Sequence, residues 1–250
     1  MGGEGVPRRL LDAEDQLNRY AYRHVVPILL APPAAPEGGM HNASGFLLRL
    51  PNGVYLGTAW HVVQHWIDQR ARGAQVLFQL SDTVAINPQD SLAWHDAPND
   101  LAFMRLTDRQ AAGVDASICE PLPLWPPVHP TADSDLFISG FPGQIRQREG
   151  DRDVNFRSFT AHLIIQEVRD RYLGCVLDQD YLTDVDGNRI ATADLNLGGM
   201  SGAPAFLLGQ LAYPVVAIVT DCALGVIRLA TLSHVDGLGR VCPARSSQGV

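Results

Sequence analysis

Three short segments place a histidine, an aspartate and a serine beside apolar stretches. His61 directly follows the apolar run in GTAWHVV, Asp100 directly precedes the one in NDLAFMRL, and Ser201 lies in the glycine-rich segment LGGMSGAPAF. We therefore expect each reactive side chain at the end of a strand, where a loop can present it in a cleft. Together these residue types could carry out acyl transfer by a nucleophilic serine.

That chemistry needs all three types. A serine hydroxyl is a poor nucleophile until an imidazole accepts its proton, and a carboxylate must hold the imidazole in the right tautomer. The oxyanion that develops on the substrate needs preorganised N–H donors. Gly198 and Gly199 precede Ser201, and glycine adopts the backbone conformations that aim two amides at one point. We expect the amides of Gly199 and Ser201 to be these donors.

Each candidate has a simpler alternative. His65 follows His61 at a distance of four residues, Asp96 precedes Asp100, and Ser201 could be an ordinary turn residue because serine is common in glycine-rich loops. Only His61 lies within T-A-x-H, and only Asp100 is followed by Leu-Ala. The sequence therefore favours His61 and Asp100, with His65 and Asp96 as their rivals.

The rest of the chain reads as short strands in two halves, which predicts an all-β fold, either two barrels or a sandwich. Prolines are concentrated between Cys119 and Pro130, and such a segment cannot continue a sheet ladder. The predicted organisation is an N-terminal extension with a short helix at 1–24, a first half at 25–115, a proline-rich linker at 116–132, a second half at 133–240 that closes with a short helix over 227–235, and a tail at 241–250.

Composition narrows the classes of partner. The 250 residues are 46% hydrophobic and 18% charged, with a formal net charge of −8, which predicts a folded protein and argues against nucleic acid or an anionic membrane as partner. No apolar run approaches a membrane span, and the first twenty residues lack the apolar core of a secretory signal. We expect a cytoplasmic protein without membrane contact.

The four cysteines, Cys119, Cys175, Cys222 and Cys242, form no C-x-x-C pair, and the eight histidines are scattered. A chain of this size without a secretory signal is not expected to depend on a disulfide framework. A zinc site needs clustered ligands. The sequence therefore predicts free thiols, no metal and no cofactor.

The motifs T-A-x-H-V, D-L-A and G-x-S-G-x-P occur here in this order as TAWHV, DLA and GMSGAP. In this they resemble the trypsin-like (chymotrypsin-fold) serine peptidases, and the flanking segments SGFLL, SGFPG and VVAIVT match as well. The resemblance extends over about residues 25–235. It implies two antiparallel six-stranded-type β-barrels with a His61–Asp100–Ser201 triad between them, and a serine endopeptidase that cleaves protein or peptide substrates through an acyl-enzyme.

One departure concerns activation. Many secreted members carry an aspartate directly before the serine, which pairs with a newly cut N-terminus, but this chain has Met200 there. It therefore looks more like the bacterial intracellular and Deg/HtrA-like branches, without the PDZ domain. The resemblance implies that the enzyme needs no N-terminal cut and leaves control by a regulatory protein partner open.

The resemblance also suggests which residues bind the substrate: Leu195, Gly198, Thr220, Asp221 and Cys222. Leu195 aligns with the base of the S1 pocket, which predicts a small or medium apolar residue at P1. A shift of one residue would instead place Asp194 there, and Asp194 or Asp221 in the pocket would favour arginine or lysine. Thr220 takes the place of the small hydroxyl residue that touches the catalytic aspartate, and Cys222 narrows the entrance to the pocket.

Two other functions compete with the endopeptidase. An α/β-hydrolase esterase needs G-x-S-x-G and the order Ser, Asp, His, whereas this chain has G-M-S-G-A and the order His, Asp, Ser, which argues against it. The alternative that stays open is a catalytically inactive binding module with a peptidase fold, which captures an extended peptide by strand addition.

Overall fold

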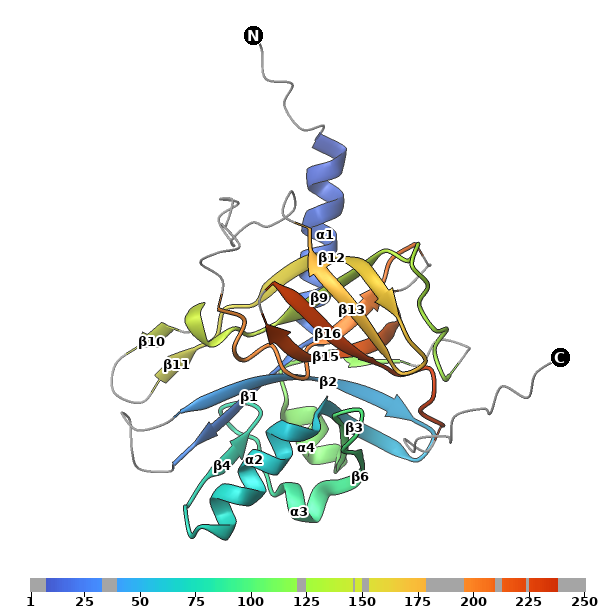
Figure 1. Cartoon of the computed structure of the whole chain (residues 1–250). Coiled ribbons are helices and arrows are strands. Elements are labelled where there is room, and N and C mark those ends of the chain that lie inside the picture. The colour runs from blue at the N-terminus through green and yellow to red at the C-terminus, as the bar shows by residue number, and fades with distance from the viewer. Residues whose placement is uncertain are drawn as a thin grey trace, which may run out of the picture.

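The computed structural model describes residues 8–32, 40–120, 125–145, 147–149, 153–178, 196–209, 213–223 and 225–237. The helices are α1 (Arg8–His24), α2 (Trp60–Ala71), α3 (Pro88–Ser91), α4 (Asp108–Gly113) and the short 3₁₀ helix η1 (Gly143–Ile145). The strands are β1 (Val26–Ala31), β2 (His41–Leu50), β3 (Gly53–Ala59), β4 (Leu77–Gln79), β5 (Ala85–Ile86), β6 (Leu92–Asp96), β7 (Leu101–Leu106), β8 (Ile118–Cys119), β9 (Leu136–Gly140), β10 (Gln147–Glu149), β11 (Asp153–Asn155), β12 (Phe159–Val168), β13 (Tyr172–Leu177), β14 (Pro204–Leu207), β15 (Val215–Ala223) and β16 (Val226–Thr231). Figure 1 shows the two halves as a lower blue-to-green layer and an upper yellow-to-red layer.

The first half is a curved, open sheet. Its strands follow the order β5-β4-β1-β2-β3-β7-β6, and β8 pairs with β2 in the parallel direction. The Pro-Asn-Gly segment predicted to turn between two strands does join β2 to β3, and Gly53 there has a φ of 145°. The helix predicted over 61–70 is observed as α2, directly after β3. This half is therefore half of a barrel, with α2 leading away from the end of β3.

The second half is a closed barrel of six strands in the order β12-β13-β16-β15-β14-β9. Along β12 and β13 buried residues alternate with more exposed ones, as expected for strands with one face in a core and one in solvent. The prediction of an all-β fold in two barrel-like halves is confirmed, although only the second half closes.

The helix predicted over residues 227–235 is wrong, since the structure places strand β16 there. Ile227 and Leu229 are buried in the barrel, whereas Val226 and Arg228, which alternate with them, are exposed. This is the period-two pattern of a strand. Ala230 and Leu232 are also apolar. Together with Ile227 and Leu229 they give apolar residues at spacings of one, two and three, which are compatible with a helix as well as with a strand. The segment forms a strand because it pairs with both β13 and β15. The loop predicted over 145–157 similarly contains the short hairpin β10–β11.

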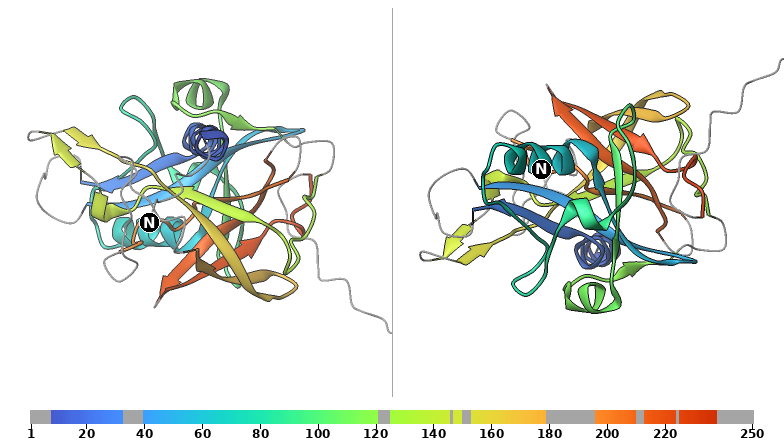
Figure 2. Two further views of the ribbon diagram at one scale, coloured as in Figure 1. Left: turned by 90° about the horizontal axis from the view of Figure 1, so that it is seen from above. Right: turned by 90° about the horizontal axis from the view of Figure 1, so that it is seen from below.

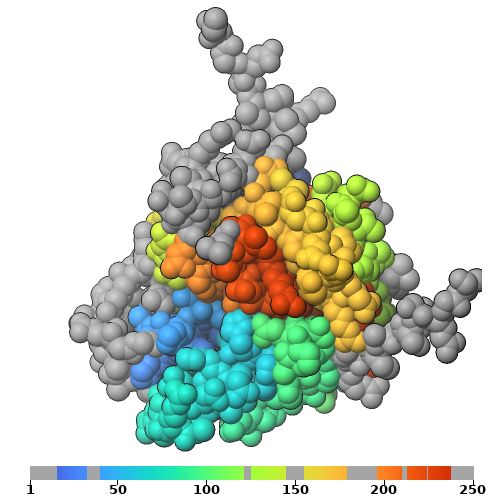
Figure 3. Space-filling model, viewed as in Figure 1, coloured from blue at the N-terminus to red at the C-terminus, as the bar shows by residue number. Residues whose placement is uncertain are grey.

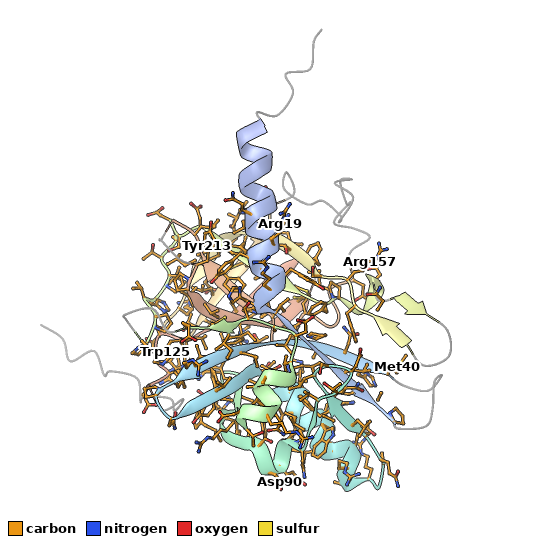
Figure 4. All side chains as sticks on the ribbon, turned by 180° about the vertical axis from the view of Figure 1, so that it is seen from behind. Arg19, Met40, Asp90, Trp125, Arg157 and Tyr213 are labelled. Atoms are coloured by element: carbon orange, nitrogen blue, oxygen red, sulfur yellow. The ribbon has the colours of Figure 1, made fainter. Side chains whose placement is uncertain are left out.

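The N-terminal helix α1 lies against the second half. Leu17 and Ala21 are buried, and the Tyr20 hydroxyl donates to the Tyr213 carbonyl at 3.1 Å. The back view in Figure 4 shows Tyr213 close to α1. Figure 2 views the same helix along its axis, as a dark blue coil. The C-terminal half of α1 therefore packs on the second half, whereas Figure 1 shows the first turns of the helix projecting beyond the strands.

An apolar cluster joins the two halves. It combines Phe46 and Phe103 of the first half with Phe137 and Phe206 of the second, and all four rings are almost fully buried. In Figure 3 the lower blue-to-green residues and the upper orange-to-red residues meet along a continuous seam. Because the halves share this core, residues at the ends of their strands keep fixed positions across the seam.

Candidate active site

His61 and Asp100 form a close pair. The imidazole Nδ1 lies 2.7 Å from Asp100 Oδ2, and the His61 backbone N–H donates to Asp100 Oδ1 at 2.7 Å. His61 is in the first turn of α2, directly after β3, and its side chain is 51% exposed. An Nδ1–H that donates to the carboxylate leaves Nε2 as the free acceptor, which is the tautomer that a general base for a serine requires.

Asp100 reaches His61 through an unusual backbone. It has a φ of 56°, and it is the only non-glycine residue with positive φ in the described part of the chain. Its N–H donates to the Ala97 carbonyl at 3.2 Å, and its carbonyl accepts from the Trp60 N–H at 3.1 Å. A left-handed conformation costs free energy in a residue with a Cβ and persists only where the surroundings fix it.

Asp96, the rival carboxylate, contacts Asn99 and Arg171 instead of His61. Its oxygens accept from the Asn99 N–H at 3.3 Å and the Asn99 side-chain amide at 2.5 Å, and Oδ2 lies 3.6 Å from Arg171 Nη1. Asp96 therefore closes the turn that leads to Asp100 and ties it to the second half. The structure brings Asp100, rather than Asp96, to the histidine.

His65, the rival imidazole, lies one helical turn from His61 with its ring against that of His41, at 4.7 Å between centroids. Burial lowers the pKa of His65, and His41 lowers it further. Among the described residues, His65 has no hydrogen bond to a carboxylate, so nothing here holds it in one tautomer as Asp100 holds His61.

Ser201 and His61 line the same pocket. The pocket has a volume of about 520 Å³ and is lined by His61, Ser201 and Gly199, together with residues of β2 and α2. Among the described residues no hydrogen bond joins Ser201 Oγ to the imidazole. The structure thus brings serine and histidine to one cavity, with the hydroxyl not yet bonded to the base.

Two backbone amides beside Ser201 have no acceptor within the described residues: those of Gly199 and Ser201. The carbonyl of Gly198 accepts from the Gly143 N–H at 2.6 Å. Because C=O and N–H point in opposite directions in a trans peptide, the Gly199 N–H points away from Gly143. Gly199 and Ser201 both line the pocket, so the arrangement offers two N–H donors beside the hydroxyl.

Glycine is required at position 199. Its φ is 102°, and an added Cβ would overlap the Asn42 side-chain amide. The adjoining turn is closed by the Met200 N–H, which donates to the Leu197 carbonyl at 3.0 Å, and by the Ala203 N–H, which donates to the Met200 carbonyl at 2.8 Å. This turn carries Ser201 at its tip.

No protein-family model matches the chain, and a search of curated proteins found no match. Among solved structures the chain is similar to the thermostable serine protease AL20 from an extremophilic microorganism, with 15% identity, 84% of this chain and 91% of the other covered, and a TM-score of 0.47. It is similar to a protease of M. tuberculosis in its active form, with 16% identity, coverage of 91% and 83%, and a TM-score of 0.47. A third is a human pathogenic astrovirus serine protease, with 14% identity, coverage of 82% and 88%, and a TM-score of 0.40. At such identities the likeness assigns no role to any residue of this chain.

The residues expected to bind substrate are only partly described. Leu195 and Asp194 lie outside the described residues. Thr220 and Asp221 line a small pocket of about 120 Å³ next to Asp100. The Thr220 hydroxyl donates to the Arg228 carbonyl at 3.2 Å, and no hydrogen bond to Asp100 is found for it among the described residues.

Gly198 and Cys222 complete the expected set. The Gly198 N–H donates to Asn196 Oδ1 at 2.9 Å, so its role here is to shape the turn before Ser201. Cys222 is partly buried against the core of the second barrel. Burial, followed by the nearby Asp221 carboxylate, raises the pKa of Cys222 to about 12. The thiol is therefore protonated, and weakly reactive, at neutral pH.

The described residues include no group of three or more His, Cys, Asp or Glu side chains placed to hold a metal ion. None of the described helices is long and apolar enough to cross a membrane.

Sequence reasoning missed Asn42 and Ser44, which lie just before and at the start of the strand segment SGFLL. The Ser44 hydroxyl donates to the Gly199 carbonyl, and the Asn42 side-chain amide donates to the Phe141 carbonyl. The available signal was a serine at the start of an otherwise apolar strand. A buried hydroxyl needs a partner, and here the partner belongs to the other half of the protein.

Proposed function

We propose that this protein is a serine endopeptidase that hydrolyses peptide bonds through an acyl-enzyme on Ser201. The observation that carries the proposal is the His61–Asp100 pair, joined at 2.7 Å, in the same pocket as Ser201 and the two amides without acceptors. Nucleophile, base, orienting carboxylate and oxyanion donors are the complete set of groups that this chemistry needs.

In the first half of the reaction, Ser201 Oγ attacks the substrate carbonyl carbon while His61 Nε2 accepts the hydroxyl proton. The carbonyl π electrons move to oxygen, and the amides of Gly199 and Ser201 stabilise that oxyanion. Each such donor is worth roughly 2.7–4 kcal/mol in the transition state. The tetrahedral intermediate collapses as the C–N bond breaks, and the imidazolium returns its proton to the leaving amine.

In the second half, a water molecule gives a proton to His61 Nε2 and attacks the acyl carbon. The new tetrahedral intermediate releases Ser201, which takes the proton back from the imidazolium, and the carboxylic acid product leaves. Asp100 stays ionised throughout and stabilises the imidazolium that forms in each half. Its contacts with both Nδ1 and the backbone N–H of His61 hold the ring in one orientation.

An extended substrate has a strand edge to pair with. Residues 204–206 of β14 pair with 215–218 of β15, and β16 takes the other side of β15. Beyond Val219 no described strand occupies the β14 side of β15. We propose that this edge, at Thr220 to Cys222, binds the substrate backbone by strand addition.

The test is a peptide-library cleavage profile combined with fluorophosphonate labelling of the purified protein. Wild type should cleave internal peptide bonds and take up the probe, and Ser201→Ala should do neither. We expect products that end in small or medium apolar residues, and cleavage mainly after Arg or Lys would show that an acidic side chain lies in the pocket instead. A wild type that binds peptides but neither cleaves them nor reacts with the probe would identify an inactive binding module.

Activation by a buried new N-terminus has no basis here, because the Met200 side chain is fully buried and uncharged. The uncut chain should therefore be active, and mass spectrometry of the active enzyme checks this. Met200→Leu should keep activity and stability. Met200→Asp should lower the thermal midpoint strongly, because it buries a carboxylate without a partner. Activity that appears only after an N-terminal cut would contradict the prediction.

A further inference from the structure

Ser44 is a fully buried polar residue at the contact between the two halves. It lies in β2, with an exposed fraction of 0%. Its hydroxyl donates to the Gly199 carbonyl at 2.8 Å and accepts from the Phe141 N–H at 2.9 Å. Both partners belong to the second half of the chain, so the hydroxyl bridges two of its loops from the first half.

The backbone of Ser44 makes further contacts with the same region. Its N–H donates to the Ser201 carbonyl at 2.9 Å, and its carbonyl accepts from the buried Thr58 hydroxyl at 2.8 Å. One residue of the first half thus holds the carbonyls of both Gly199 and Ser201. These two residues supply the proposed oxyanion donors.

The Ser44 hydroxyl restricts the backbone torsions of Gly199. Gly199 has almost no intrinsic preference between its accessible conformations, so its surroundings must select one. The peptide before it is fixed by the bond from the Gly143 N–H to the Gly198 carbonyl. The peptide after it is fixed by Ser44, and no other described group donates to the Gly199 carbonyl.

The Phe141 loop is held in the same way. Its N–H donates to Ser44 Oγ, and its carbonyl accepts from the Asn42 side-chain amide at 2.5 Å. Asn42 and Ser44 are two residues apart on β2, so their side chains leave the same face of the strand. This face thereby fixes the loop on which the Gly199 turn rests.

We propose that Ser44 is a positioning residue that keeps the Gly199 and Ser201 amides aimed into the pocket. It does so by neutral hydrogen bonds across the two halves, in a chain whose Met200 supplies no ion pair for this purpose. Ser44 touches neither the substrate nor the reacting atoms. The inference rests on the proposed function for its kinetic consequence, but the conformational claim stands apart from it.

The experiment compares Ser44→Ala with Ser139→Ala. Ser139 is also a fully buried serine, and its hydroxyl is bonded to that of Thr160 at 3.2 Å within the second barrel. Ser44→Ala should lower kcat about 10²-fold with KM nearly unchanged, since misplacing a catalytic group by about 1 Å has an effect of this size. Ser139→Ala should leave kcat unchanged.

Amide hydrogen exchange is measured on the same proteins. Ser44→Ala should speed exchange in the segment 198–202 while exchange in β9 and β15 stays at the wild-type rate, and Ser139→Ala should not affect that segment. If Ser44→Ala does not fold, Ser44→Cys takes its place, because a thiol is of similar shape and donates only weakly.

A failure of the proposed function can be distinguished from a failure of the proposed role of Ser44. If the wild type neither cleaves peptides nor reacts with a fluorophosphonate, the proposed function fails, and the exchange of segment 198–202 still decides the role of Ser44. If a folded Ser44 variant keeps both the wild-type kcat and the wild-type exchange, Ser44 positions nothing and the inference is overturned, even in a working peptidase.

Discussion

Replacing Ser201 or His61 by alanine should lower kcat by about 10⁶-fold, and replacing both should lower it little further. The reason is that the hydroxyl and the imidazole act as one unit, so losing either removes the nucleophilic pathway. The residual rate would come from substrate binding and the two amides. Initial rates on a peptide with a chromogenic leaving group measure this, with the variants expressed in cells free of contaminating peptidase.

His65→Ala is the matched control, since His65 lies on the same helix and lines the same pocket. It should keep kcat within about tenfold of wild type, because its ring has no orienting carboxylate among the described residues and no part in the proton transfers. A loss at His65 as large as that at His61, or single losses that simply multiply in the double variant, would contradict the proposed triad.

Replacing Asp100 by asparagine should lower kcat about 10⁴-fold at neutral pH. In wild type one carboxylate oxygen accepts from the His61 backbone N–H and the other from Nδ1. Asparagine has a single side-chain oxygen, and we expect it to accept the hydrogen bond from the His61 backbone N–H. The amide NH₂ group then faces Nδ1. The imidazole must then carry its proton on Nε2, where Ser201 needs an acceptor.

Asp96→Asn separates this effect from a general disturbance of the turn. It should lower the thermal midpoint, because it weakens the contacts with Asn99 and Arg171, while kcat stays within about tenfold of wild type. A collapse of kcat in Asp96→Asn beside near-normal rates in Asp100→Asn would show that Asp96, rather than Asp100, orients His61.

The His61–Asp100 contact could be predicted because T-A-x-H and D-L-A occur in the order of a known motif set and each residue lies directly at a strand end. β3 and β7 are neighbouring strands, with Ala59 opposite Leu101, so His61 and Asp100 emerge side by side. The division into two all-β halves could be predicted from the proline-rich break between two groups of short apolar segments, whereas the choice of barrels over a sandwich came from the motif resemblance. These inferences depend on short local motifs or on one repeated pattern, although the two residues of the pair are 39 positions apart.

The other features depend on contacts between distant residues. Nothing near Ser44 in the sequence indicates that its hydroxyl meets Gly199, 155 residues away. Nothing within residues 227–235 shows that β13 and β15 lie on either side to pair with them. The openness of the first sheet likewise follows from which strands find partners. Local spacing thus identifies the reacting residues, while long-range pairing determines what holds them.

The shared apolar cluster between the halves limits how such a sequence can change over evolutionary time. Phe137 and Phe206 stack at 5.0 Å between ring centroids, and they are packed in one cluster with Phe46 and Phe103 from the other half. A smaller ring on one side leaves a void that only the opposite half can fill. The two halves must therefore accumulate substitutions jointly, and a half taken from a distant homologue would bring the wrong shape to this seam.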